Sequence, residues 1–283
     1  MNALARRAAG LLLGTLCLPV AAFAADVQPT HEFILDNGLK VVVREDHRAP
    51  VVVSQIWYKV GSSYETPGQT GLSHALEHMM FKGSAKVGPG EASLILRDLG
   101  AEENAFTSDD FTAYYQVLAR DRLGVAFELE ADRMANLRLP PEEFSREIEV
   151  IKEERRMRTD DRARSVVYEQ LMATAYQAHP YRRPVIGWMP DLEAMQPEDA
   201  REWYRRWYAP NNAYLVVVGD VDHREVFREA EKHYGSLAAD ELPARRISPE
   251  PAQRGPRAAV VKAPAELPYL AMAWLVARMT SRR

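Results

Sequence analysis

Two histidines and a glutamate in the run His74-Ala75-Leu76-Glu77-His78 are the residues of this chain whose types and spacing most directly suggest chemistry. On a helix, side chains four positions apart lie one turn apart, and both imidazole rings can therefore reach one metal ion. Imidazole is a common zinc ligand, and a catalytic zinc site keeps one position open for water. Glu77 shares that face and can take a proton from the water and pass it to a leaving amine. The pattern indicates zinc-dependent hydrolysis of peptide bonds.

The order of the motif, His-x-x-Glu-His, is inverted relative to the more frequent His-Glu-x-x-His and is the signature of a separate class, the inverzincins. The motif alone does not decide between a zinc site and a half-buried helix that merely displays two histidines and a carboxylate. The choice between these interpretations therefore depends on the rest of the chain.

The beginning of the chain has the composition of a secretory signal peptide. Arg6 and Arg7 precede an apolar run at 8–19, and the small-x-small triplet at 22–24 is typical of a cleavage site. The alternative, a membrane anchor, requires a longer apolar stretch. We therefore expect a signal peptide at 1–24, cleavage after Ala24, and a mature chain in the periplasm or outside the cell without a membrane span.

The composition is that of an ordinary acidic globular protein. A chain of 283 residues with 47% hydrophobic and 27% charged residues can form one or two domains with a sizeable core. Cys17, the only cysteine, lies in the expected signal peptide, which leaves histidine, aspartate and glutamate as metal ligands. The formal charge of −4 becomes −6 once Arg6 and Arg7 are removed, and this gives no electrostatic reason to expect nucleic-acid binding.

Strand and helix patterns alternate along the chain, which predicts an α+β fold with an antiparallel-looking sheet. The Asn-Gly pair at 37–38 is a strong hairpin signal between the first two strands. The expected strands are 31–35, 40–44, 51–60, 103–107, 112–118 and 213–218. The expected helices are 71–81, 91–99, 120–137, 140–158, 162–176, 198–207 and 224–234.

The sequence changes character after the last of these helices. Residues 242–257 are rich in proline and arginine and lack apolar periodicity, which indicates a linker. Residues 258–262 and 267–276 have strand patterns, but two uncovered strands are poor structure on their own. We expect 25–241 to form one domain and 258–283 to begin a truncated second domain, unless the two strands pair with the first.

Several ordered blocks place the motif in a wider context: GLSHALEHMMFKG at 71–83, NAFTS at 104–108 and ADRM at 131–134. Together they resemble the pitrilysin, insulinase and mitochondrial-processing-peptidase family of inverted-motif zinc peptidases, and the blocks are similar to those of a bacterial member. The resemblance extends over about 31–274 and corresponds to the family's N-terminal catalytic half. It implies one bound zinc ion and a mixed, largely antiparallel sheet with helices packed on it.

In that family the third zinc ligand is a glutamate on a later helix, about as far beyond the second histidine as Glu154 is here. The resemblance thus implies Zn²⁺ bound by His74, His78 and Glu154, with water as fourth ligand and Glu77 as base. Glu147, two turns before Glu154, would be an outer carboxylate that orients a histidine or tunes the water. The alternative for this helix is a solvated charged face.

The resemblance also implies an edge strand on which an extended peptide substrate forms main-chain hydrogen bonds with Asn104, Ala105 and Phe106. In the alternative interpretation, Phe106 belongs to the core and Asn104 caps a turn. The other histidines have no ligand-like spacing, and we expect them to be surface or packing residues. They are His31, His47, His179, His223 and His233.

The function implied is that of a secreted zinc-dependent metalloendopeptidase acting on peptides or unfolded polypeptide segments. Active members of the family need a second domain, in the same chain or in a partner subunit, which supplies an arginine and a tyrosine to the substrate. We expect no residue of this chain to fill those roles. Two alternatives remain open: a catalytically silent, metal-binding half-enzyme that serves as a subunit or peptide-binding partner, and an unstable truncated product.

Overall fold

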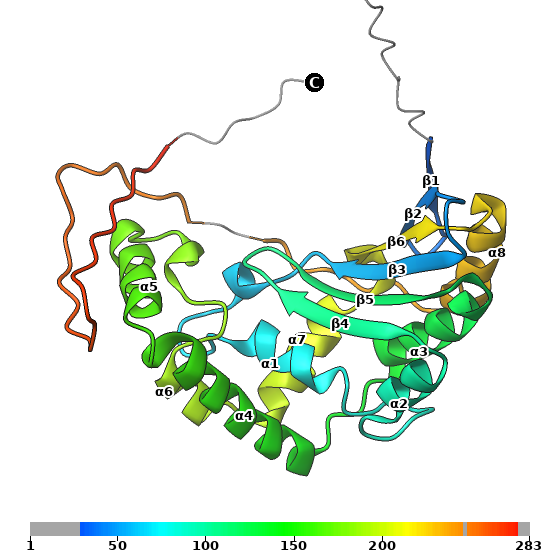
Figure 1. The fold of residues 1–283 in the computed structure, drawn as a ribbon, viewed down its shortest axis with the longest axis horizontal. Coiled ribbons are helices and arrows are strands. Elements are labelled where there is room, and N and C mark those ends of the chain that lie inside the picture. The colour runs from blue at the N-terminus through cyan, green and yellow to red at the C-terminus, as the bar shows by residue number, and fades with distance from the viewer. Residues whose placement is uncertain (1–28, 246–247, 277–283) are drawn as a thin grey trace, which may run out of the picture.

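The computed structural model describes residues 29–245 and 248–276 (Figure 1). The expected signal peptide, its cleavage site after Ala24 and Cys17 lie outside the described residues, as does the end of the expected second domain at 277–283. Within the described part, none of the helices has the length and apolar character that crossing a membrane requires.

A six-stranded sheet forms the centre of the fold, with the strand order β1-β2-β6-β3-β5-β4. Neighbouring strands are antiparallel except β2 and β6, which run parallel. The mixed, largely antiparallel sheet of an α+β fold is thus confirmed, and β4 lies at an edge. The bounds of the strands are β1 Thr30–Ile34, β2 Lys40–Glu45, β3 Val51–Tyr58, β4 Glu102–Thr107, β5 Thr112–Ala119 and β6 Ala213–Gly219.

Helices cover one face of this sheet, and Figure 1 shows α1, α3 and α7 on that side. Side chains alternate between the two faces of a strand. In the central strand β3, Val52, Ile56 and Tyr58 are buried under the helices, whereas Gln55 and Trp57 on the opposite face are only half-buried. The hydrophobic core therefore lies between the sheet and the helical layer.

All of the helices expected from the sequence are present, and the structure adds α6. A six-residue helix is too short to show apolar periodicity, which explains why the sequence analysis did not predict it. The bounds of the helices are α1 Leu72–Met79, α2 Glu91–Asp98, α3 Leu123–Asn136, α4 Pro141–Arg155, α5 Ala163–Ala175, α6 Met189–Ala194, α7 Pro197–Trp207 and α8 His223–Tyr234. Short 3₁₀ turns lie at Ser62–Tyr64, Arg120–Arg122, Pro180–Arg182 and Pro210–Asn212, and one π-helical turn lies at Arg156–Asp160.

The prediction of two strands at 258–262 and 267–276 is wrong. Residues 248–276 form neither helix nor strand and run as irregular chain near α5 (Figure 1). A strand pattern becomes a strand only where a neighbour supplies hydrogen bonds and a surface covers its apolar face. The described chain offers neither, since Val260 is 90% exposed and Trp274 is 74% exposed.

The motif helix α1 is anchored at its N-terminus by the buried carboxylate of Glu65. Its Oε2 accepts the Gly71 backbone N–H at 2.9 Å and its Oε1 accepts the Ser73 N–H at 2.7 Å. The first N–H groups of a helix have no partner within the helix, and a carboxylate there is favoured by the helix dipole. The loop that follows β3 is thereby tied to the start of α1.

A close approach of two glycines fixes the same end of α1. Gly71 has a φ of +86°, in the left-handed region. A Cβ at this position would lie 2.6 Å from the carbonyl oxygen of Ile186 and 2.9 Å from the Cα atom of Gly187. The backbone that precedes α6 can therefore touch the start of α1 only because neither glycine has a side chain.

Gly71→Ala should lower the free energy of unfolding by roughly 2–5 kcal/mol, because it adds a left-handed alanine and a backbone clash. Gly90 is a matched control, since it precedes α2 with a φ of +72° but has open space where a Cβ would point. Gly90→Ala should cost only the conformational penalty of about 1–2 kcal/mol. Urea denaturation of both variants measures the difference, and equal losses would contradict the role of the close approach.

Glu65 should make stability depend on pH. Burial raises the pKa of Glu65 to about 7, above the ordinary 4.5 expected in the unfolded chain, although its two backbone hydrogen bonds oppose the shift. The native state then keeps this proton to higher pH, and between pH 4.5 and 7 this group lowers the free energy of unfolding as pH rises.

Glu65→Gln cannot titrate at this position. The free energy of unfolding of the variant minus that of the parent chain should therefore rise by about 1–3 kcal/mol from pH 4.5 to 7. The amide also replaces one of the two acceptor oxygens, which adds a loss that does not vary with pH. Urea denaturation at pH 5, 6 and 7 gives the difference between the two proteins. A difference that stays constant over this interval would show that Glu65 is not the group responsible.

Candidate metal centre

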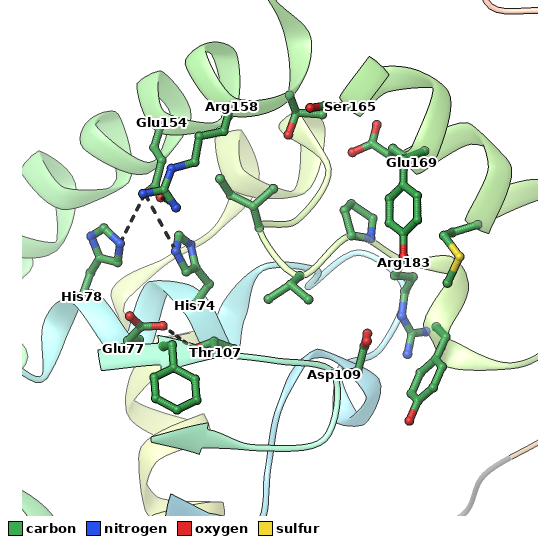
Figure 2. Close-up of a pocket in the computed structure, with 18 of the residues that line it drawn as sticks. His74, Glu77, His78, Thr107, Asp109, Glu154, Arg158, Ser165, Glu169 and Arg183 are labelled. Atoms are coloured by element: carbon green, nitrogen blue, oxygen red, sulfur yellow. Dashed lines mark hydrogen bonds and ion pairs between the residues drawn. The ribbon is translucent and has the colours of Figure 1, made fainter. Parts of the chain in front are cut away.

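Two histidines from α1 and one glutamate from α4 meet at a single point where these helices pack together (Figure 2). The His78 Nε2 atom lies 3.4 Å from Glu154 Oε2, and the His74 Nε2 atom lies 3.8 Å from the same oxygen. One ligand atom from each of the three residues lies within 4.8 Å of the other two. The structure thus brings together the three residues that the sequence predicted as metal ligands.

The donor set and its orientation fit a zinc ion. The rings of His74 and His78 are 4.7 Å apart and inclined at 67°, an arrangement that lets both Nε2 atoms face the oxygen of Glu154. Two imidazoles and one carboxylate are a common protein contribution to catalytic zinc, which keeps a fourth position open. Burial, together with the charge of His78, lowers the pKa of His74 to about 4. Without metal, His74 is therefore neutral, whereas His78 must lose a proton when a metal binds.

Glu147 holds the far side of the His78 ring. Its Oε1 lies 3.0 Å from His78 Nδ1, and its Oε2 lies 2.6 Å from Lys82 Nζ. Burial opposes protonation of His78, but its hydrogen bonds to Glu147 and Glu154 raise the pKa of His78 to about 9. A carboxylate on the outer ring nitrogen of a metal-binding histidine fixes the orientation of the ring. Glu147 lies where the sequence predicted it, whereas sequence reasoning missed Lys82.

The end of α4 adds a cation to the site. The π-helical turn that follows α4 carries Arg158, which pairs with Glu154 Oε1 at 2.7 Å. The hydrogen bond to His78 is the main cause of the lowered pKa of Glu154. Glu153, one position earlier, points to solvent and pairs with Arg156. The sequence analysis did not assign Arg158 to the site, although its spacing of four from Glu154 was a usable signal.

Glu77 lies beside the cluster on the inner side of α1. It is 9% exposed, and the hydroxyl of Thr107 at the end of β4 donates to its Oε2 atom (Figure 2). Burial is the main reason why the pKa of Glu77 is raised. A carboxyl group with increased proton affinity is suited to proton transfer near neutral pH. No pattern in the sequence pairs Thr107 with a residue 30 positions away.

The edge strand β4 runs along the same cavity, which has a volume of about 860 Å³ and is lined by Asn104, Ala105 and Phe106 together with the residues of the cluster. Phe106 is 37% exposed and meets the ring of Trp57 edge-on at 5.3 Å on the open face of the sheet. Asn104 lies exposed in mid-strand. The alternative of a core Phe106 and a turn-capping Asn104 is therefore wrong.

Comparison with known families gives two matches that together span most of the chain. A family model described as insulinase, peptidase family M16, matches residues 40–188. A second model, described as the peptidase M16 inactive domain, matches residues 194–282. These matches confirm the resemblance that the sequence blocks indicated.

Curated relatives come from bacteria and from mitochondria. The zinc protease PqqE of Helicobacter pylori is 38% identical over 249 residues, which cover 86% of this chain and 56% of that protein. The mitochondrial-processing peptidase subunit beta of Lentinula edodes is 32% identical over 76% of this chain and 47% of its own length. Human cytochrome b-c1 complex subunit 1 is 33% identical over 82% of this chain and 49% of its own length. The chain spans about half the length of these relatives.

Solved structures show the same fold. A protease from Helicobacter pylori superposes with a TM-score of 0.80 at 36% identity, over 83% of this chain and 57% of that one. The first half of the periplasmic protease PqqL from Escherichia coli gives a TM-score of 0.73 at 27% identity, over 79% of this chain and 49% of that one. The insulinase family model matches more than half of the residues of this chain. The chain therefore belongs to the insulinase family of zinc metallopeptidases, peptidase family M16.

Proposed function

We propose that this chain is the zinc-binding catalytic half of an exported metalloendopeptidase that cleaves peptides or unfolded polypeptide segments. The main support is the convergence of His74, His78 and Glu154 beside the buried carboxyl group of Glu77. A site of this composition on two packed helices, in a member of a zinc metallopeptidase family, matches the needs of metal-assisted hydrolysis.

In this proposal His74, His78 and Glu154 hold one Zn²⁺ ion and leave a position for water. A zinc ion there supplies Lewis acidity, which activates water and stabilises negative charge on a substrate carbonyl oxygen. Glu147 keeps the Nε2 atom of His78 directed at the site, because it binds the other ring nitrogen.

Glu77 acts as the general base and then as the general acid. The hydrogen bond from Thr107 fixes its Oε2 atom, and the other oxygen of the carboxylate is therefore the one that exchanges a proton. Burial raises the pKa of Glu77, which strengthens it as a base and lets it deliver the proton to the departing nitrogen.

Substrate binding is assigned to β4 through Asn104, Ala105 and Phe106. In the described chain β4 pairs only with β5, which leaves its outer edge free to bind another strand. Strand addition uses the main chain of the substrate and tolerates many side chains. A substrate bound in this way must be extended, which favours peptides and unfolded segments over folded proteins.

A second candidate function is suggested by relatives that are themselves named as subunits. The chain would then be a partner-dependent half-enzyme, silent alone and completed by a second family subunit. One relative is named as a subunit of the mitochondrial processing peptidase, which is consistent with this arrangement.

An exported location is supported by the signal-like N-terminus and by the similarity to the periplasmic protease PqqL.

Glu77→Gln should abolish peptide hydrolysis while the metal content stays equal to that of the parent chain. The amide cannot accept the proton, and a loss of at least about 10²-fold in turnover is expected. A quenched fluorescent peptide library with zinc-loaded protein measures turnover, and elemental analysis measures zinc. Undiminished hydrolysis by the variant would refute the role of Glu77. A folded, zinc-loaded parent chain without activity would instead favour the partner-dependent half-enzyme.

Glu147→Gln should weaken zinc binding at the catalytic centre by about 10- to 100-fold, because a neutral amide orients His78 less strongly. Glu149→Gln is a matched control on the same helix, since the side chain of Glu149 is 68% exposed and pairs with Lys152. Competition with a chromophoric chelator measures both affinities. Equal affinities for the two variants would show that Glu147 does not support the metal.

A further inference from the structure

A second cluster of two histidines and a carboxylate lies at the opposite edge of the sheet from β4. His31 on β1, Glu45 at the end of β2 and His223 at the start of α8 each offer a ligand atom, and these atoms all lie within 4.8 Å of one another. All three residues are partly buried. We propose that His31, Glu45 and His223 form a second divalent-metal site that takes Zn²⁺ independently of the catalytic centre.

The positions of these residues are set by regular structure. In the antiparallel pairing of β1 with β2, His31 lies opposite Val43, and Glu45 is therefore its diagonal neighbour on the same face. In the parallel pairing of β2 with β6, Glu45 lies beside Gly219, shortly before α8 begins at His223. The ligands thus come from strands and a helix, which hold a site more accurately than loops do.

Two stacked ring pairs lock α8 onto β1. Phe33 stacks on Phe227 with the ring centroids 4.6 Å apart, and His31 stacks on His223 with the centroids 3.7 Å apart. The two helix residues lie one turn apart and the two strand residues lie on one face, which makes the pairs successive steps of one packed contact. The Phe33–Phe227 pair contains only carbon rings. The His31–His223 pair in the same contact is imidazole on imidazole and therefore carries nitrogen donors.

Glu45 supplies the negative charge that a divalent cation needs. Its Oε1 atom accepts the backbone N–H of His223 at 2.8 Å and lies 2.7 Å from His223 Nδ1. The carboxylate therefore already points at one of the two imidazoles.

A further histidine extends the donor set. The Nε2 atom of His47 lies 3.6 Å from Glu45 Oε2, while its Nδ1 atom lies 2.7 Å from Asp220. Asp220 is held in turn by Arg120 at 2.8 Å. A carboxylate on the outer nitrogen of an imidazole is the usual support of a metal-binding histidine. His47 thus places a third imidazole beside Glu45, next to the three residues of the proposed site.

The competing explanation is a packing contact in which two imidazoles cover the start of α8. The rings of His31 and His223 are inclined by only 5°, and their nitrogen lone pairs therefore lie in nearly parallel planes instead of converging on one ion. Binding of one ion by both residues requires rotation of at least one ring about its Cβ–Cγ bond. Added metal ion therefore changes the ring environment if the site exists, whereas a packing contact stays the same with and without metal.

The test uses the full chain with His74→Ala and His78→Ala, which removes the catalytic centre from the measurement. After metal removal this protein should bind one Zn²⁺ per chain, measured by titration and elemental analysis, and Zn²⁺ should raise its melting temperature. Addition of His31→Phe and His223→Phe keeps the stacked rings but removes the nitrogens, and both effects should disappear. Co²⁺ should give the visible absorption of a tetrahedral site only in the first protein.

Glu45→Gln in the same background should weaken Zn²⁺ binding by at least about tenfold, by analogy with the loss on removing supporting carboxylates. Glu32→Gln is the matched control, because Glu32 is an exposed carboxylate of β1 paired with Lys40. The proposal is overturned if the background protein binds no more Zn²⁺ than the protein with both phenylalanines, or if Glu45→Gln binds as well as Glu32→Gln. If the background protein does not fold, the His31→Phe and His223→Phe changes in the otherwise unmodified chain should reduce its zinc content from two ions to one.

Discussion

The packing of α1 against α4 is the contact on which the chemistry of this protein depends, because neither helix holds a complete set of ligands. An isolated helix of eight residues is marginal in water, and α1 therefore owes its position to the residues around it. Leu76 and Met79 are buried in the core, Glu65 holds the N-terminal N–H groups, and the glycine contact with the chain before α6 sets the entry. A small displacement of the start of α1 would move both histidines relative to Glu154.

The surroundings of the metal centre shift the pKa values of its carboxyl groups in two opposite directions. Glu147 and Glu154 have lowered pKa values because histidines and, for Glu147, Lys82 bind them, despite the opposing effect of burial. Glu77 has a raised pKa because burial outweighs the hydrogen bond from Thr107. Carboxyl groups whose environments push their pKa values apart can take different roles in one site. In the proposed mechanism, the same residue type thus supplies anionic groups that bind the metal or orient a ligand and a carboxyl group that transfers a proton.

Local periodicity made the ligand helices predictable, whereas no local pattern predicted the contacts between distant segments. The spacing of four in α1 placed His74 and His78, whereas the family resemblance implied Glu154 as the third ligand, with Glu147 two turns before it. Glu65 at the start of α1, Thr107 on Glu77, and the cluster of His31 with Glu45 and His223 join residues that only the fold brings together. The expected strands after residue 257 failed for the same reason, because a pattern of alternating residues does not specify a partner strand.

The two edges of the sheet differ in a way that agrees with these assignments. An unpaired edge strand can accept another strand, wanted or unwanted, and proteins usually block such edges. At the β1 edge, stacked rings and the polar cluster fasten the strand to α8. At the β4 edge, the strand faces the cavity beside Glu77. A metal ion at His31, Glu45 and His223 would strengthen the first edge without touching the second. Strand addition would then be directed to β4, where an extended chain lies within reach of the catalytic residues.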